Sequence, residues 1–171
     1  MRTVRNTFYL ALSFIMASHF VNAQEKRASP PANVKATING TDIIINYSSP
    51  SVKGRTIWGD LVPYDKVWRT GANEATTIEF SKDVKVEGKS VKAGKYALFT
   101  VPGKDKWKVI LNAVPDQWGA YNYDASKDIF SFETKPKSDK MSESLKFGVS
   151  DKGTVTMNWE KLKVSFDVKQ G

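Results

Sequence analysis

Apolar and polar side chains alternate along the C-terminal part of the chain with a period of two residues. From Lys161 to Lys169, apolar residues occupy every even position, and Lys, Ser or Asp occupies every odd position. Successive side chains of a β-strand point to opposite faces, so this pattern predicts a strand with one buried and one solvent-facing side. Similar alternation occurs at residues 43–47, 107–111, 145–149 and 155–159.

Turn sequences separate these runs, and no stretch beyond residue 24 keeps a helical period for three turns. The turns are Asn39-Gly40, Glu87-Gly88, Ala93-Gly94, Pro102-Gly103 and Asp151-Lys152-Gly153. Short strands joined by hairpin-sized turns are typical of two packed antiparallel sheets. We therefore predict an all-β antiparallel sandwich of roughly eight to ten strands, jelly-roll or Greek-key-like. A closed β-barrel is the alternative.

The N-terminus has the order of segments found in a secretory signal peptide. Arg2 and Arg5 precede an apolar run from Phe8 to Phe20, and small residues follow up to Ala23. The run is shorter than the roughly 20 residues that cross a bilayer, so we do not expect a membrane-spanning protein. We expect cleavage after Ala23 and export to the periplasm or the exterior. With no cysteine to carry a lipid, a lipoprotein is not expected.

The remaining chain is long enough for one domain with its own core. We predict a signal peptide over residues 1–23, a flexible leader over 24–33 and a single β domain over 34–171. Small exported domains often depend on disulfides, but this chain has no cysteine. Burial of apolar side chains must therefore hold the fold together.

The charge is basic, but its pattern does not indicate nucleic-acid binding. Loss of Arg2 and Arg5 would lower the net charge from +8 to about +6, leaving 24 basic and 18 acidic residues. Most of the excess is lysine at alternating positions, as on the solvated face of a strand. Nucleic-acid binding would need arginine-rich or aromatic-interleaved clusters, which are missing. The expected partner is a carbohydrate or another envelope polymer.

Several catalytic chemistries are excluded by composition. The chain has no cysteine, and its single histidine, His19, lies in the predicted signal peptide. This removes Ser-His-Asp and Cys-His catalysis, zinc sites of His and Cys, haem ligation by His and thiol redox chemistry. We expect no cofactor and no metal site. Carboxylate chemistry remains, as in glycoside hydrolysis, and Glu74 is the best single candidate for it.

Two segments, Ser49–Glu74 and Pro115–Asp128, break the alternation, and loops of this length are often functional. Aromatic rings there would stack on sugars while amides and a guanidinium bind hydroxyls. The candidate ligand-binding residues are Trp58, Trp68, Arg69, Asn73, Glu74, Trp118, Tyr121 and Tyr123. Alternatively, Trp68 and Trp118 fill the ends of the sandwich, and Glu74 pairs with Arg69 or caps a turn.

Stretches within and around these segments resemble a family of exported bacterial proteins, domain of unknown function 2911. The matching stretches are Gly59–Tyr64, Val67–Thr76, Ile78–Phe80, Ala93–Tyr96, Trp107 and Trp118–Tyr123. The resemblance runs from about Ser48 to Val168 and implies one domain there. It implies no activity, cofactor or catalytic residues. Three hypotheses stay open: a non-catalytic binding module, a carboxylate-based hydrolase such as a glycosidase, and a structural or assembly domain.

Overall fold

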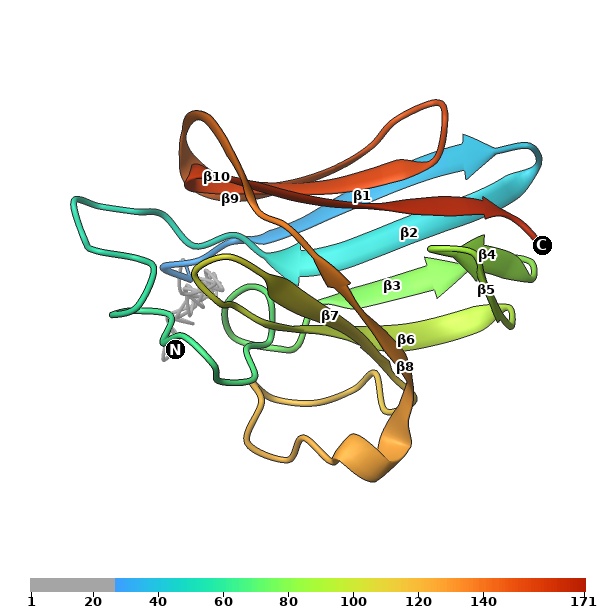
Figure 1. The fold of residues 1–171 in the computed structure, drawn as a ribbon, viewed down its shortest axis with the longest axis horizontal. Helices are drawn as coiled ribbons and strands as arrows, with labels where there is room; N and C mark the ends of the chain where they lie inside the picture. The colour runs from blue at the N-terminus through green and yellow to red at the C-terminus, as the bar shows by residue number, and fades with distance from the viewer. Residues whose placement is uncertain (1–26) are drawn as a thin grey trace, which may run out of the picture.

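The computed structural model describes residues 27–171, which form ten β-strands and one short 3-10 helix. The strands make two antiparallel sheets (Figure 1), with the orders β1-β2-β3-β6-β7-β8 and β5-β4-β10-β9. The predicted sandwich is confirmed, and within these residues the sheets do not close into a barrel. No helix in the described part of the chain has the length and apolar character needed to cross a membrane.

The six-stranded sheet contains β1 (Pro31–Ile38), β2 (Thr41–Ser48), β3 (Thr77–Phe80), β6 (Gly94–Val101), β7 (Trp107–Asn112) and β8 (Asp128–Thr134). The four-stranded sheet contains β5 (Lys89–Val91), β4 (Val84–Val86), β10 (Thr154–Gln170) and β9 (Lys137–Val149). The 3-10 helix η1 (Ala125–Lys127) directly precedes β8.

The domain begins slightly earlier than the sequence predicted. Strand β1 starts at Pro31, so the last three residues of the predicted leader, 31–33, belong to the sheet. Proline has no backbone N–H to donate and fits the first position of an edge strand, which is where Pro31 lies. The predicted signal peptide and its cleavage after Ala23 lie outside the described residues.

Strand β10 contributes two sets of side chains to the core: the first set has odd residue numbers and the second has even residue numbers. The buried residues are Val155, Met157 and Trp159, followed by Val164, Phe166 and Val168. A regular strand would direct odd and even positions to opposite faces. The pairing with β9 shifts register on both sides of Glu160, whose φ is 54°. This β-bulge resets the alternation, so both halves of β10 face the core.

Four tryptophans meet in the core between the sheets. Trp58 lies edge-on to Trp107 at 4.9 Å between ring centroids, and Trp68 stacks on Trp159 at 5.9 Å. Edge-to-face and offset stacking are favourable arrangements for aromatic pairs. Trp68 is only 8% exposed. This side chain from the first irregular segment is therefore part of the core.

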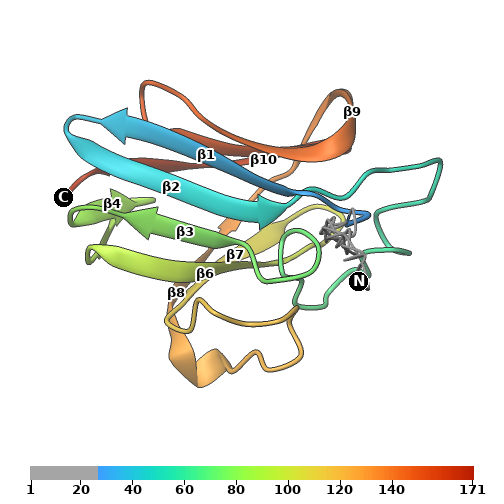
Figure 2. The same ribbon diagram turned by 180° about the vertical axis from the view of Figure 1, so that it is seen from behind.

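A second apolar cluster lies on the outer face of the six-stranded sheet, where the segment between β7 and β8 covers it (orange in Figure 2). Phe99 and Ile110 are its large buried members, and Tyr123 from the covering segment packs on Phe99 at 5.1 Å. Buried Asn112 holds the segment by donating to Asp124 O at 3.0 Å and to Asp128 Oδ1 at 2.8 Å.

Candidate binding site

The two irregular segments pair with each other in space. Glu74 and Trp118 form an isolated antiparallel bridge. On either side of it, Ala75 N donates to Gln117 O at 2.9 Å and Gly119 N donates to Asn73 O at 3.0 Å. Backbone hydrogen bonds thus fix the position of Trp118 relative to Glu74, although the two residues are far apart in sequence.

An open cleft of about 650 Å³ lies beside this bridge, and we call it the Trp118 cleft. Its lining includes Asn33, Asn46 and Thr77, which stand opposite one another on β1, β2 and β3. Residues paired across neighbouring strands share one face of a sheet, so these three form a polar row on the outer face. The segment Pro115–Trp118 lines the cleft from the covering loop.

The side chain of Trp118 is available to solvent at this cleft. It is 57% exposed, whereas Trp68 and Trp159 are buried. Tyr121 on the same loop is 83% exposed but does not line the cleft. A large aromatic ring exposed at a concave, partly polar surface offers a flat apolar face to a bound ligand.

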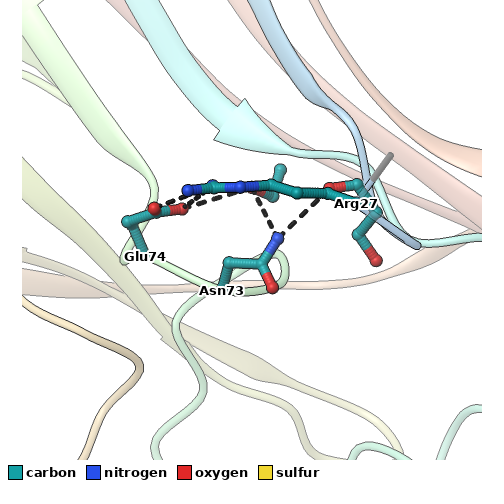
Figure 3. Close-up of polar contacts among 5 residues, drawn as sticks. Arg27, Asn73 and Glu74 are labelled. Carbon is teal, nitrogen blue, oxygen red and sulfur yellow. Dashed lines mark hydrogen bonds and ion pairs between the residues drawn. The ribbon is translucent and has the colours of Figure 1, made fainter. Parts of the chain in front are cut away.

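Glu74 is held at one end of the cleft by an arginine from the N-terminal segment (Figure 3). Arg27 Nη1 donates to Glu74 Oε1 at 2.8 Å and to Oε2 at 3.0 Å. Asn73 Nδ2 donates to Ser29 O at 3.1 Å and to Ser48 Oγ at 3.2 Å, fixing the same N-terminal segment. The alternative pairing of Glu74 with Arg69 does not form, and Glu74 pairs with Arg27 instead.

Hydrogen bonding keeps Glu74 ionised. Its own backbone N–H lowers the pKa of the carboxyl group most, burial opposes this as the second-largest effect, and the hydrogen bond and charge of Arg27 lower the pKa further. The second carboxylate lining the cleft, Asp116, pairs with Lys95 at 3.2 Å. Within residues 27–171, no three acidic or histidine side chains gather as a metal site.

The other predicted site residues lie elsewhere. Trp58 and Trp68 pack in the core cluster, and Tyr123 packs on Phe99 while donating to Asp128 Oδ2 at 2.6 Å. Arg69 lines a different, smaller cavity. Of the eight predicted ligand-binding residues, only Glu74 and Trp118 therefore line the Trp118 cleft.

The polar row of the cleft and Arg27 are not among the residues predicted from the sequence. The row becomes visible only when β1, β2 and β3 are aligned in register, which places Asn33 and Asn46 side by side. A usable signal was present, since asparagine is uncommon in strand interiors. Arg27 gave no such signal because it lies in the predicted leader.

The molecule is thus an antiparallel β-sandwich with an open, partly aromatic cleft on the outer face of its larger sheet. The family described as "Protein of unknown function (DUF2911)" matches residues 29–168. The chain belongs to this family, as the resemblance in the sequence indicated. Comparison with curated proteins and with solved structures finds no match.

Proposed function

We propose that this protein is a non-catalytic binding module that holds a carbohydrate, or another polar polymer of the cell envelope or its surroundings, in the Trp118 cleft. The observation that supports this best is the exposed indole of Trp118 at an open cleft of about 650 Å³. Export, predicted from the N-terminal sequence, belongs to the same proposal, because it would bring the cleft to such polymers.

The chemistry of the cleft suits a sugar chain. The apolar face of a sugar ring packs on an indole, and its hydroxyl groups both donate and accept hydrogen bonds. The amides of Asn33, Asn46 and Gln117 offer both kinds of partner. The volume lies within the range of sites that enclose most of a small organic ligand, so a short oligosaccharide fits.

The hydrolase hypothesis is less well supported by the same residues. A glycosidase needs one carboxyl group that keeps its proton near neutral pH and a second that is ionised. Hydrogen bonds lower the pKa of Glu74, so this side chain suits only the ionised role. The other carboxylate lining the cleft, Asp116, is largely exposed and does not have the apolar surroundings that the acid of such an enzyme needs.

The structural hypothesis predicted that Trp68 and Trp118 are both buried and that Arg69 pairs with Glu74. Trp68 is buried, but Trp118 is exposed and Glu74 pairs with Arg27. The contacts of the second loop with the core are made by other residues, such as Tyr123. An exposed Trp118 therefore favours ligand binding over internal packing.

Isothermal titration calorimetry tests the proposal. The probes are peptidoglycan fragments and neutral oligosaccharides of glucose, xylose and mannose. We expect saturable binding of at least one probe, weakened about tenfold or more by Trp118→Ala, because stacking and apolar burial are lost. Tyr121→Ala is the matched control, since Tyr121 is exposed on the same loop but outside the cleft.

Both variants should unfold at nearly the same temperature as the wild type, because exposed side chains contribute little to stability. Ligand binding that Trp118→Ala leaves unchanged would contradict the proposal. The absence of measurable binding with every probe would contradict it as well. Release of reducing sugar that Glu74→Gln abolishes would support the hydrolase instead.

A further inference from the structure

A second cavity, of about 260 Å³, lies beside the core tryptophans, and we call it the Arg69 cavity. Arg55 and Arg69 both line it, together with Trp68 and Trp159. It shares no lining residue with the Trp118 cleft. Asn73 lines the Arg69 cavity while its neighbour Glu74 lines the cleft, so the two sites adjoin along this segment.

Arg69 lacks the partners that a partly buried cation normally has. Its Nε is buried without a hydrogen bond, and no ion pair joins its guanidinium to an acidic side chain within residues 27–171. Burial lowers the pKa of Arg69, opposed only by the phenol of Tyr121. Buried charges in proteins are usually paired, because removing a charge from water is unfavourable. The surroundings of Arg69 are therefore complementary to an anion.

The rest of the lining strengthens this conclusion. No aspartate or glutamate lines the Arg69 cavity, so its charge is positive. Arg55 is oriented by its backbone neighbours, with Nε donating to Val52 O at 3.1 Å and Nη2 to Ser51 O. Two arginines thus line one small space, and no acidic residue is among its lining residues.

We propose that the Arg69 cavity binds a carboxylate carried on a compact ring, as in a uronic acid. The guanidinium fork matches the two oxygens of a carboxylate. The volume lies just below the range of typical ligand sites, which limits the ligand to about one ring. Leu61, the exposed apolar residue of the lining, provides apolar contact for that ring. Sulfate and phosphate share the charge but would lack this contact.

Calorimetric titration with glucuronate tests the inference, with methyl glucoside and inorganic sulfate as comparison probes. We expect saturable glucuronate binding, weaker binding of sulfate and no binding of methyl glucoside. Arg69→Gln should weaken glucuronate binding about tenfold or more. Arg69→Lys keeps the charge but loses the fork, so its affinity should fall between those of the wild type and Arg69→Gln. Added salt should weaken the interaction.

Lys152→Gln is the control for the loss of one positive charge, because Lys152 is exposed in the β9–β10 turn and lines neither cavity, so its loss should leave glucuronate affinity unchanged. Arg69→Gln removes a charge without a partner, so the variant should fold, which a thermal melt checks. Absence of glucuronate binding, or an equal affinity in Arg69→Gln, would overturn the site. If sulfate bound as tightly as glucuronate, the proposed apolar contact with the sugar ring would be wrong. If methyl glucoside bound as tightly as glucuronate, the proposed contact between the arginines and the carboxylate would be wrong. All of these titrations use protein that also carries Trp118→Ala, so that binding of a sugar in the Trp118 cleft does not contribute to the measured affinities.

Discussion

Asn112 is the single side chain that most directly positions the loop carrying Trp118. The residue is fully buried, and its amide bonds to Asp124 O, Asp128 Oδ1 and Val114 N. All three partners belong to the segment that follows it. Each bond is modest, but removing one partner leaves other buried polar groups unsatisfied.

Replacing Asn112 by alanine should therefore lower the free energy of unfolding by about 2 kcal/mol. Urea denaturation measures this change. Asn122→Ala is the control, because Asn122 is exposed on the same loop, and its effect should stay within about 0.5 kcal/mol. Equal effects of the two substitutions would show that Asn112 does not anchor the segment.

At the residue scale, the sequence predicted an acid that lines the Trp118 cleft, but not the partner of that acid. Glu74 lies at the end of the first irregular segment, and the sequence makes it the best single candidate for carboxylate chemistry. Its ion pair goes to Arg27, 47 residues away, instead of to the nearby Arg69. Several arginines could pair with Glu74, and the tertiary structure determines which of them lies close enough. The sequence alone does not give these distances. The exposure of Trp118 and the burial of Trp68 depend on tertiary structure in the same way.

The β9–β10 hairpin shows what the turn sequences determine at the scale of elements. Gly153 in its turn has φ 83°, and a Cβ there would overlap Val168 O. Gly88, in the β4–β5 turn, has a similar φ of 80° but nothing within 4 Å of its Cβ position. The positive φ favours glycine at both positions. Only at Gly153 would a side chain also collide with a neighbouring atom.

Gly153→Ala should therefore destabilise the protein by more than about 2 kcal/mol, and Gly88→Ala by about 1 kcal/mol. Thermal and urea unfolding of the two variants measure the difference. A Gly153→Ala protein as stable as the Gly88→Ala protein would mean that the close approach of Val168 to the turn does not constrain the hairpin.

The period-two patterns predicted the strands well, because burial of one face imposes alternation. Two features of the sheets do not follow from these patterns. The bulge at Glu160 joins two runs of opposite parity into one strand, β10. The loop after β7 covers the outer face of the sheet, so β6 is buried on both sides between Tyr96 and Thr100. The register shift in β10 and the covering of β6 by the loop arise from contacts between residues that are far apart in sequence. The alternation of apolar and polar residues does not reveal such contacts.

Five carboxyl groups within residues 27–171 have pKa values below their ordinary range, which affects the molecule as a whole: Asp42, Glu74, Asp83, Asp124 and Glu133. Hydrogen bonds from side chains or backbone are the largest cause in each case. In the folded state these groups release their protons more readily than in the unfolded state. Their contribution to stability is present above the unfolded pKa values and is lost as pH falls through the folded ones.

The melting temperature should accordingly be nearly constant from neutral pH to about pH 5 and fall below about pH 4. The decrease should be modest, because these side chains are largely exposed and well solvated. Melts monitored by circular dichroism across this range measure it. A melting temperature that rises toward pH 3 would have the wrong sign for carboxylates stabilised in the folded state.

Sugar binding at the Trp118 cleft is tested most sharply by nuclear magnetic resonance of the tryptophan indole N–H groups during titration with the neutral oligosaccharides. The chain has five tryptophans, so each indole reports one location. If the Trp118 cleft binds sugar, the Trp118 signal and the side-chain amides of Asn33, Asn46 and Gln117 shift saturably, while the signals of buried Trp107 and Trp159 stay in place. Saturable shifts confined to other parts of the molecule, or no shift with any oligosaccharide, would contradict binding at this cleft.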